Sequence, residues 1–419
     1  MNAIERADLV IVGAGTVGGW AGWFAANAGF GRVVVLEQGV AGQGASSRAA
    51  GIVRAQGGTP TTVALGRWSI DFYRTQAATI GTDSGFRELG YLILAVTEED
   101  ERAGRERVAM QQREGLAVRW LDARAAATIS GTLGQDGHRG GSFLETDGHI
   151  DPPRNVRAYS LAMQQAGVEL RERTAFTGLR TDRSRGGGRR VVGVDTSAGP
   201  ISTERVLLTG GPSLREVGRL AGMRIPAGAV RHTVAVLERD PAFAAAQPMV
   251  FDIGAGLYWR LEEGGLLFGW SDPNDRRGEA RAVDWTMYTA MRERLAGFVP
   301  ATQELALRKV WAATIDFTPD HLPILGPGLA PDGSLIRGVT VASAGGHGMM
   351  WGPAVARVAA DLAGEGRTDV TDVSELGLDR FDEQGRSRLA TDPIALPFPT
   401  SADDPLAAGE RAGSGPAAG

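Results

Sequence analysis

Short apolar runs alternate with glycine-rich or polar turns along most of this chain, and the first run lies close to its N-terminus. Residues 8–12 (DLVIV) are mostly apolar and β-branched, which is typical of a buried strand in a parallel sheet. A glycine-rich turn follows, then a helical segment to about Ala28, then a second apolar run, 32–36, that ends at Glu37. This order predicts a strand, a tight turn, a helix and a parallel strand.

The turn and the acidic residue of this unit have the positions that a bound dinucleotide requires. Gly13 allows the tight turn, Gly15 lets the backbone approach a pyrophosphate, and Gly18 lets the helix pack closely on the strand. The helix N-terminus offers free N–H groups to the anion. Glu37 can accept hydrogen bonds from ribose hydroxyls. The unit predicts a dinucleotide site and does not by itself distinguish FAD from NAD.

A second strand–glycine–helix pattern lies near the C-terminus. Residues 335–342 read as a strand, the glycine cluster 345–348 as a turn, and residues 353–364 as a helix. The N–H groups of such a turn can face the electron-rich edge of a reduced flavin and stabilise its charge.

Composition excludes several kinds of chemistry. The chain has 419 residues, 43% of them hydrophobic and 22% charged, as expected for a globular protein of about two domains. It has no cysteine, which excludes disulfides, thiolate metal sites and a flavin tethered through sulfur. Its five histidines lack metal-ligand spacing, so we expect no metal site.

Charge and hydropathy also limit the partners and the location. The net charge of −5 argues against nucleic acid as a partner. No apolar run reaches the roughly 18–20 residues that a membrane-spanning helix needs. A strand that begins within about eight residues of the N-terminus leaves no room for a signal peptide, so we predict a cytoplasmic protein.

The loop after Glu37 carries a resemblance to a known family. Its sequence, 42–54, is GQGASSRAAGIVR, a polar segment where an NAD dehydrogenase normally has another helix. With the first glycine motif, this loop resembles the FAD-dependent amine and amino-acid oxidoreductases related to D-amino-acid oxidase, in particular the sarcosine oxidase and dimethylglycine dehydrogenase branch. Further similar segments are 147–153, 167–174, 206–212, 256–260, 269–273, 318–326 and 344–350.

The resemblance implies an α/β fold of two domains: a discontinuous Rossmann-type FAD-binding domain and a substrate domain with a mostly antiparallel sheet. The expected segments are 1–83, 150–222 and 312–380 for the FAD-binding domain, and 84–149 and 223–311 for the substrate domain. Residues 98–114 read as a charged, exposed helix and 285–298 as an amphipathic helix that packs on the substrate sheet. The Ala-, Gly- and Pro-rich tail, 401–419, is expected to be disordered.

The resemblance also implies how the flavin is held. Relatives that attach it covalently use a cysteine near the C-terminal glycine motif or a histidine in the loop after the first acid, whereas this chain has no cysteine and carries Arg48 in that loop. We therefore expect non-covalent FAD. The expected cofactor-binding residues are Gly13, Gly15, Gly18, Glu37, Ser46, Ser47, Arg48, Thr174, Gly210, Gly345, Gly346, Gly348 and Met349.

In the implied reaction, a hydride passes from the carbon beside nitrogen to the flavin, and the imine that forms hydrolyses. Arg54 is the candidate for binding a substrate carboxylate, because a guanidinium binds carboxylates bidentately. His347 and His321 are candidates for the flavin ring, and Tyr258 and Arg260 for the substrate cavity. For each of these five residues a structural role stays open.

The substrate class follows from the resemblance and from one departure. Met350 stands where sarcosine oxidases have a carboxylate-binding lysine, and residues 349–351 (MMW) suggest an apolar wall, so we expect a bulkier substrate than sarcosine. The predicted substrate is a small amine or amino acid of the secondary, N-methyl or D type, with oxygen or another acceptor taking the electrons. Two alternatives are a 2-hydroxy-acid dehydrogenase and a flavin-carrying subunit that needs a partner chain.

Overall fold

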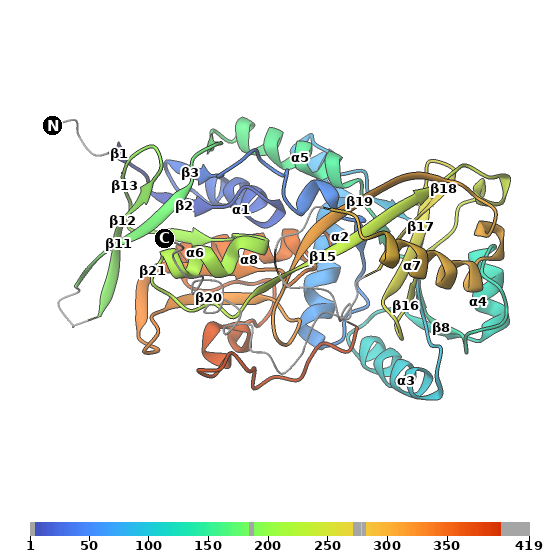
Figure 1. Cartoon of the computed structure of the whole chain (residues 1–419). Coiled ribbons are helices and arrows are strands. Elements are labelled where there is room, and N and C mark those ends of the chain that lie inside the picture. Colours follow the sequence, from blue (N-terminus) through green and yellow to red (C-terminus); the bar gives the residue numbers. More distant parts are fainter. Residues whose placement is uncertain (1–4, 184–187, 271–277, 279–281, 395–419) are drawn as a thin grey trace, which may run out of the picture.

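The computed structural model describes residues 5–183, 188–270, 278 and 282–394. The tail predicted to be disordered, 401–419, lies outside these residues. Two large sheets occupy opposite ends of the molecule, and the long helix α2 (Pro60–Ile80) lies between them (Figure 1). Among the described residues, no helix is both long and apolar enough to cross a membrane.

The first sheet has ten strands in the order β1-β13-β12-β21-β14-β2-β3-β10, with β11 on β12 and β20 on β21. Its centre, β21-β14-β2-β3-β10, is parallel, as a Rossmann-type sheet requires. Its strands are β1 (Glu5–Arg6), β2 (Leu9–Val12), β3 (Val33–Leu36), β10 (Glu169–Arg171), β11 (Phe176–Arg183), β12 (Arg189–Thr196), β13 (Ile201–Ser202), β14 (Val206–Leu208), β20 (Ile324–Leu329) and β21 (Leu335–Ser343).

Both faces of this sheet are covered, which explains why strands β14, β2 and β3 are apolar at every position. Leu9 and Ile11 of β2 pack in one core with helices α1 (Thr16–Asn27), α5 (Pro152–Gln165) and α8 (Gly352–Glu365). Val10 and Val12 of the same strand pack in the opposite core, with α6 (Leu214–Leu220).

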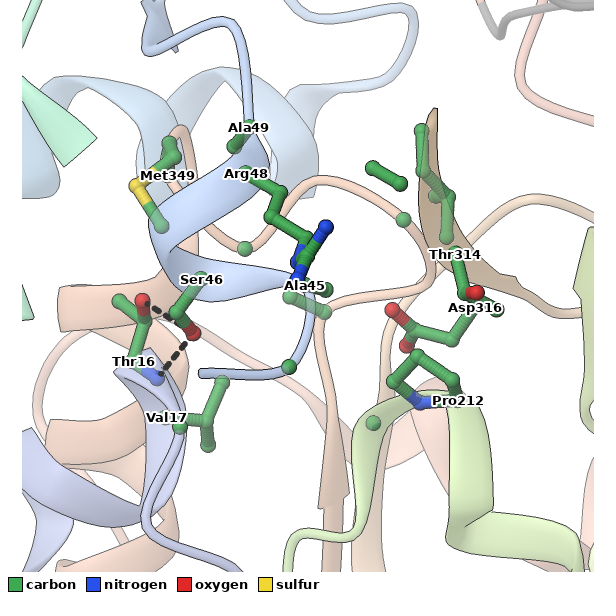
Figure 2. Close-up of a pocket in the computed structure, with 18 of the residues that line it drawn as sticks. Thr16, Val17, Ala45, Ser46, Arg48, Ala49, Pro212, Thr314, Asp316 and Met349 are labelled. Carbon is green, nitrogen blue, oxygen red and sulfur yellow. Dashed lines mark hydrogen bonds between the residues drawn. The ribbon is translucent and has the colours of Figure 1, made fainter. Parts of the chain in front are cut away.

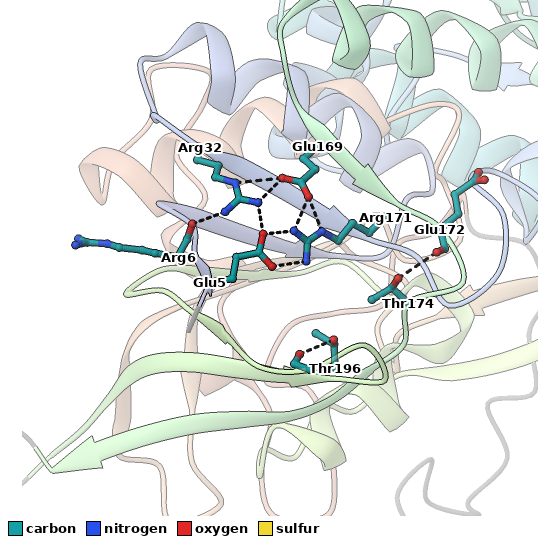
Figure 3. Close-up of polar contacts among 9 residues, drawn as sticks. Glu5, Arg6, Arg32, Glu169, Arg171, Glu172, Thr174 and Thr196 are labelled. Carbon is teal, nitrogen blue, oxygen red and sulfur yellow. Dashed lines mark hydrogen bonds and ion pairs between the residues drawn. The ribbon is translucent and has the colours of Figure 1, made fainter. Parts of the chain in front are cut away.

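Two arginines and two glutamates tie three elements at the edge of this sheet. Arg171 donates to Glu5 on β1, and Arg32, just before β3, donates to Glu169 on β10 at 2.6 Å (Figure 3). Hydrogen bonds from Arg171 and Arg32 lower the pKa of Glu5 to about 2. The cluster fixes β1 beside the start of the parallel strands.

The second sheet has eight strands in the order β19-β15-β18-β17-β16-β6-β8-β7. All its pairs are antiparallel except β16 with β6, so the expected mostly antiparallel sheet is present. Its strands are β6 (Tyr91–Leu94), β7 (Arg119–Leu121), β8 (Gly141–Leu144), β15 (Gly228–Leu237), β16 (Met249–Asp252), β17 (Leu257–Glu262), β18 (Gly265–Trp270) and β19 (Leu307–Phe317).

Helices on this side follow the sequence pattern closely. Helix α7 (Trp285–Phe298) buries Met291 and Leu295 in the same core as Trp259 and Phe268 of the sheet. The expected charged helix is α3 (Glu98–Arg113), and α4 spans Ala123–Ser130. The 3₁₀ helices are η1 (Ser46–Arg48), η2 (Gly211–Ser213), η3 (Pro241–Phe243), η4 (Pro300–Thr302), η5 (Ser374–Leu376) and η6 (Leu378–Arg380).

A small third sheet joins the two large ones. It consists of β4 (Ile52–Val53), β9 (Gly148–His149) and β5 (Arg87–Glu88), with β9 in the centre. Arg54 directly follows β4, so this sheet sets the position of that side chain. Strand β19 runs through the domain boundary drawn between residues 311 and 312, and the exact division of the chain stays a prediction.

Candidate active site

A cavity of about 640 Å³ lies between the two large sheets, within the size range of small-molecule sites. At one end its wall is formed by the glycine turn before α1, Glu37 and the loop that follows. At the other end it is formed by Arg54, Tyr91 and strands of the second sheet. We call these the cofactor end and the substrate end.

At the cofactor end, polar groups hold the loop against the start of α1. The backbone N–H of Thr16 donates to Ser46 Oγ at 3.0 Å, and Thr16 Oγ1 lies 3.1 Å from the same atom (Figure 2). The Glu37 carboxylate accepts from the backbone N–H groups of Ala14 at 3.1 Å and Gly39 at 2.8 Å. The acid is thereby fixed at the cavity wall, beside Gly15.

The packing around Gly18 tests whether a dinucleotide fits here. A Cβ on Gly18 would lie 1.8 Å from Gly13 O and 2.6 Å from Thr209 Oγ1, so only glycine lets α1 start this close to the strand ends. The N-cap residue Gly15 has no side chain, and the N–H of the next residue, Thr16, is bonded to Ser46 Oγ. The close approach at Gly18, the small residues of the turn and Glu37 are the features that fit a dinucleotide such as FAD.

The second glycine motif borders the same end. Gly346, Gly348 and both methionines of residues 349–351 line the cavity, whereas Trp351 packs in the core behind it, so the apolar wall is narrower than expected. His347 also lines the cavity, and its Nδ1 lies 3.0 Å from Gly345 O. Burial lowers the pKa of His347 to about 3, so its ring is neutral at pH 7.

Asp316 is a half-buried acid of the cavity wall that was not predicted from the sequence. It lies near the end of β19 and accepts a hydrogen bond from Ser343 Oγ at 2.9 Å. Burial raises its pKa. Asp316 and Arg48 lie on opposite sides of this part of the cavity (Figure 2). Asp316 could have been suspected from the sequence, because it lies just before the segment 318–326 that resembles the family.

At the substrate end, His232 and Tyr258 form a buried pair. Tyr258 Oη lies 2.5 Å from His232 Nε2, and the two rings stack with centroids 5.5 Å apart. Burial lowers the pKa of His232 to about 3 and raises that of Tyr258, so both side chains are neutral at pH 7. His232 was not predicted from the sequence, although a histidine within the apolar strand β15 was a signal.

The pair forms across an intervening strand. His232 lies on β15 and Tyr258 on β17, with β18 between them, and Tyr258 is directly opposite Gly269 of β18. A Cβ on Gly269 would lie 2.2 Å from Tyr258 Oη and 3.0 Å from His232 Nε2. The absence of a side chain at this position therefore allows the contact.

Arg54 brings a buried positive charge to the substrate end. Its side chain is 3% exposed and lines the cavity. It donates to two backbone carbonyls, that of Gln56 and, at 3.0 Å, that of Ile394. Its guanidinium also lies over the Tyr91 ring, 6.0 Å from the centroid.

A buried acid, Asp147, lies behind Arg54. Asp147 accepts from the backbone N–H of Ala55 at 2.7 Å and from Gln56 Nε2 at 3.1 Å. Burial raises its pKa to about 7. Asp147 is therefore only partly ionised at neutral pH and does not fully balance the charge of Arg54. A buried guanidinium beside a cavity suits an anionic group of a ligand.

The cavity separates the predicted site residues into two groups. Those in its wall are Gly13, Gly15, Glu37, Ser46, Arg48, Arg54, Gly210, Tyr258, Gly346, His347, Gly348 and Met349. Those outside its wall are Gly18, Ser47, Thr174, Arg260, His321 and Gly345. Arg260 instead donates to Ala50 O at 2.7 Å and forms an ion pair with Glu262, so it supports the wall from behind.

Comparison with known proteins gives a family and several relatives. Residues 8–362 match the sequence model of a family described as FAD dependent oxidoreductase. The chain is 29% identical to the 4-methylaminobutanoate oxidase (formaldehyde-forming) of Paenarthrobacter nicotinovorans over 324 residues, which are 74% of this chain and 38% of that protein. The chain therefore spans less than half the length of that relative.

Two further similarities cover most of this chain. It is 24% identical to sarcosine oxidase subunit beta of Rhodobacter capsulatus over 386 residues, which are 90% of this chain and 89% of that protein. Its fold resembles the crystal structure of L-proline dehydrogenase from P. horikoshii, with a TM-score of 0.82 at 22% identity, over 92% of this chain and 100% of that chain.

Proposed function

The chain belongs to the FAD-dependent oxidoreductase family, and from that premise we propose that it oxidises the C–N bond of a small amine or amino acid. One observation carries this proposal: a single cavity joins a dinucleotide cradle to a compartment that holds a buried guanidinium, Arg54, and the neutral pair of His232 and Tyr258. The name of the relative that oxidises 4-methylaminobutanoate, which carries both an amine and a carboxylate, supports the same class.

The bound flavin would supply the acceptor for a hydride from the carbon beside the substrate nitrogen. The proposed task of this chain is to orient that carbon, which lowers the barrier by several kcal/mol without a dedicated acid–base residue. Arg54 would bind a carboxylate of the substrate. Tyr258, whose Oη is fixed by His232, would accept a hydrogen bond from the amine.

We propose that FAD is held non-covalently by the residues at the cofactor end. The chain has no cysteine, and η1, which covers the start of α1, consists of two serines and Arg48. Glu37 would bind the ribose and the start of α1 the pyrophosphate. FAD released from the protein by denaturation, with no flavin left on the polypeptide, is the expected result; flavin that stays bound would contradict it.

Anaerobic bleaching of the flavin absorbance tests the reaction. Purified yellow protein is mixed with N-methyl, D- and L-amino acids, simple amines and 2-hydroxy acids, and the expected result is bleaching by an amine or amino acid. Bleaching by hydroxy acids alone would favour the 2-hydroxy-acid alternative. Readmission of air then separates an oxidase, which recovers its colour quickly, from a dehydrogenase.

The second candidate is a flavin-carrying subunit that needs a partner chain. It is favoured by the similarity to a sarcosine oxidase subunit over 90% of this chain. A stable yellow protein that no substrate of the panel bleaches would support it, whereas turnover by the purified chain alone would exclude it. The cytoplasmic location stays a prediction from the sequence, which cell fractionation would check.

We also propose that the ten-stranded sheet belongs to the FAD-binding domain and the eight-stranded sheet to the substrate domain. The strands of the first sheet fall within 1–83, 150–222 and 312–380. Limited proteolysis with and without FAD would test the division, since cofactor binding should protect the first set of segments more strongly.

A further inference from the structure

Part of the wall at the substrate end comes from a segment beyond the family match, which ends at residue 362. Residues 391–394, which we call the C-terminal strap, bring Ile394 to the cavity. Ile394 is 1% exposed and packs in the same cluster as Tyr91, Phe251 and Tyr258. Those three aromatic residues line the same compartment.

Buried hydrogen bonds anchor the strap at its start. The backbone N–H of Asp392 donates to Asp320 O at 2.9 Å, and the Asp392 carboxylate accepts from the N–H of Ile394 at 2.8 Å. Asp320 is itself held by Arg380, whose Nε and Nη2 lie 2.7 Å and 3.0 Å from its two carboxylate oxygens. Both side chains of that ion pair are at most 1% exposed. The strap is therefore fixed through its two buried residues, Asp392 and Ile394, whereas Thr391 and Pro393 are exposed.

The strap also contacts the residue that we assign to the substrate carboxylate. Arg54 Nη2 donates to Ile394 O at 3.0 Å, so the strap carbonyl restricts the orientation of the guanidinium. A second carbonyl, that of Gln56, accepts from Nη1. A planar guanidinium has five N–H groups, and these two bonds leave others for a ligand.

We propose that the C-terminal strap sets the size of the substrate and the aim of Arg54. The side chain of Ile394 closes the compartment beside Tyr258, and the Ile394 carbonyl holds the guanidinium in the plane in which it meets a carboxylate. A substrate chain that extends past Arg54 meets Ile394, so the residue selects short carboxylic substrates against long ones. This assignment rests on the proposed function in treating Arg54 as the carboxylate-binding residue.

The test uses inert carboxylates, so that it does not depend on turnover. Acetate, butanoate and hexanoate are titrated into the FAD-loaded full chain, and dissociation constants are read from the shift of the flavin absorbance. The variants are Ile394→Ala, which enlarges the compartment, and Ile394→Phe, which fills it. Leu389→Ala is the matched control, because Leu389 lies in the same C-terminal stretch and packs against the core of the first sheet. FAD content and melting temperature confirm that each variant is folded.

The expected result is a change of preference in opposite directions. In Ile394→Ala the ratio of the hexanoate to the acetate dissociation constant should fall by about tenfold, and in Ile394→Phe it should rise by a similar factor, because each buried methylene changes affinity several-fold. Leu389→Ala should keep the wild-type ratio. Equal ratios in all four proteins, or a shift in Leu389→Ala as large as that in Ile394→Ala, would overturn the proposal.

A separate outcome would affect only the proposed role of Arg54. If no carboxylate shifts the wild-type spectrum, the same titrations are made with acetamide, butanamide and hexanamide. If the preference between short and long amides changes when residue 394 is replaced, the strap still forms the wall of the compartment. The proposed role of the strap in orienting Arg54 would then be wrong. Absence of any preference among the amides would contradict the strap proposal as a whole.

Discussion

The two ends of the cavity are built in different ways. The cofactor end consists largely of backbone: the start of α1, the turn before α8 and short loops, each made by residues adjacent in sequence. The substrate end is lined by side chains from distant parts of the chain, among them Arg54, His232, Tyr258 and Ile394. In the proposed function the first end would recognise the phosphates and ring edges of one cofactor, whereas the second would place specific side chains around a substrate.

The ends also differ in electrostatics. At the substrate end burial shifts the pKa of Asp147 to about 7 and that of His232 to about 3. The cofactor end also holds groups with shifted pKa values, His347 and Asp316, but it adds the peptide dipoles of two helix starts, which are permanent. Substitutions at the two ends should therefore have different consequences, and the following experiments are ordered from the largest expected effect to the smallest.

Gly18→Val should abolish cofactor binding. Its side chain would overlap Gly13 O, and the start of α1 must shift away from the strands. The expected product is colourless protein that free FAD does not reconstitute, measured by visible absorbance. Gly297→Ala is the control, because a Cβ at that position would meet no atom within 4 Å other than those of its own helix backbone. A yellow Gly18→Val protein with normal FAD content would show that the close approach is dispensable.

Asp147→Asn should change how stability depends on pH. An aspartate of the unfolded chain titrates near 3.9, and burial raises the pKa of Asp147 to about 7 in the folded protein. Between about pH 4 and 7 the folded state therefore binds a proton at Asp147 that the unfolded state does not. The contribution of protonated Asp147 to the free energy of unfolding is fully present below about pH 4 and is lost as the pH rises through 7.

Across that window the wild type should lose up to about 4 kcal/mol of unfolding free energy relative to Asp147→Asn. Urea denaturation of both proteins at several pH values gives the difference. Asp182→Asn, a substitution of an exposed carboxylate, should run parallel to the wild type. Parallel curves for Asp147→Asn as well would contradict the buried titration.

Arg54→Met should weaken the use of carboxylic substrates while FAD stays bound. Loss of a buried charge-assisted contact costs about 2–3 kcal/mol, which corresponds to a fall in kcat/KM of about 100-fold. For simple amines without a carboxylate, kcat/KM should fall by less than about threefold, and these substrates are the internal control. Equal losses on both substrate classes would mean that Arg54 supports the fold and not the substrate.

Tyr258→Phe should have the smallest effect of the four. It removes the hydroxyl that lies against His232 Nε2 and leaves the ring packing in place. The loss of one neutral hydrogen bond to the amine is worth about 1–1.5 kcal/mol, so kcat/KM should fall by about tenfold with an unchanged flavin spectrum. An unchanged kcat/KM would remove Tyr258 from substrate binding.

The sequence predicted the elements of the fold well where local patterns decide them. The two strand–glycine–helix units appear as β2 with α1 and β21 with α8, and the amphipathic segment 285–298 is helix α7 with the same bounds. A strand buried on both faces must be apolar throughout, and a tight turn at a phosphate must be glycine. Such requirements act within a few residues, so they can be read from the chain.

The substrate end could not be read in the same way. His232 meets Tyr258 only because β15, β18 and β17 pair in a register that places Gly269 between them. Arg260 follows Tyr258 by two residues, yet it supports Ala50 from behind the wall. Both side chains lie on the same face of β17, so the alternation along the strand does not tell which of them reaches a cavity that two separate sheets enclose.

By itself, then, the sequence determined the cofactor class, the α/β architecture and most backbone elements of the cofactor end, because each depends on short-range backbone geometry. The tertiary structure alone decided the membership of the substrate end, where His232 and Ile394 join residues far from them in the chain. The physical reason is that a cavity wall is set by strand register and by the packing of remote segments, and both are properties of the folded chain as a whole.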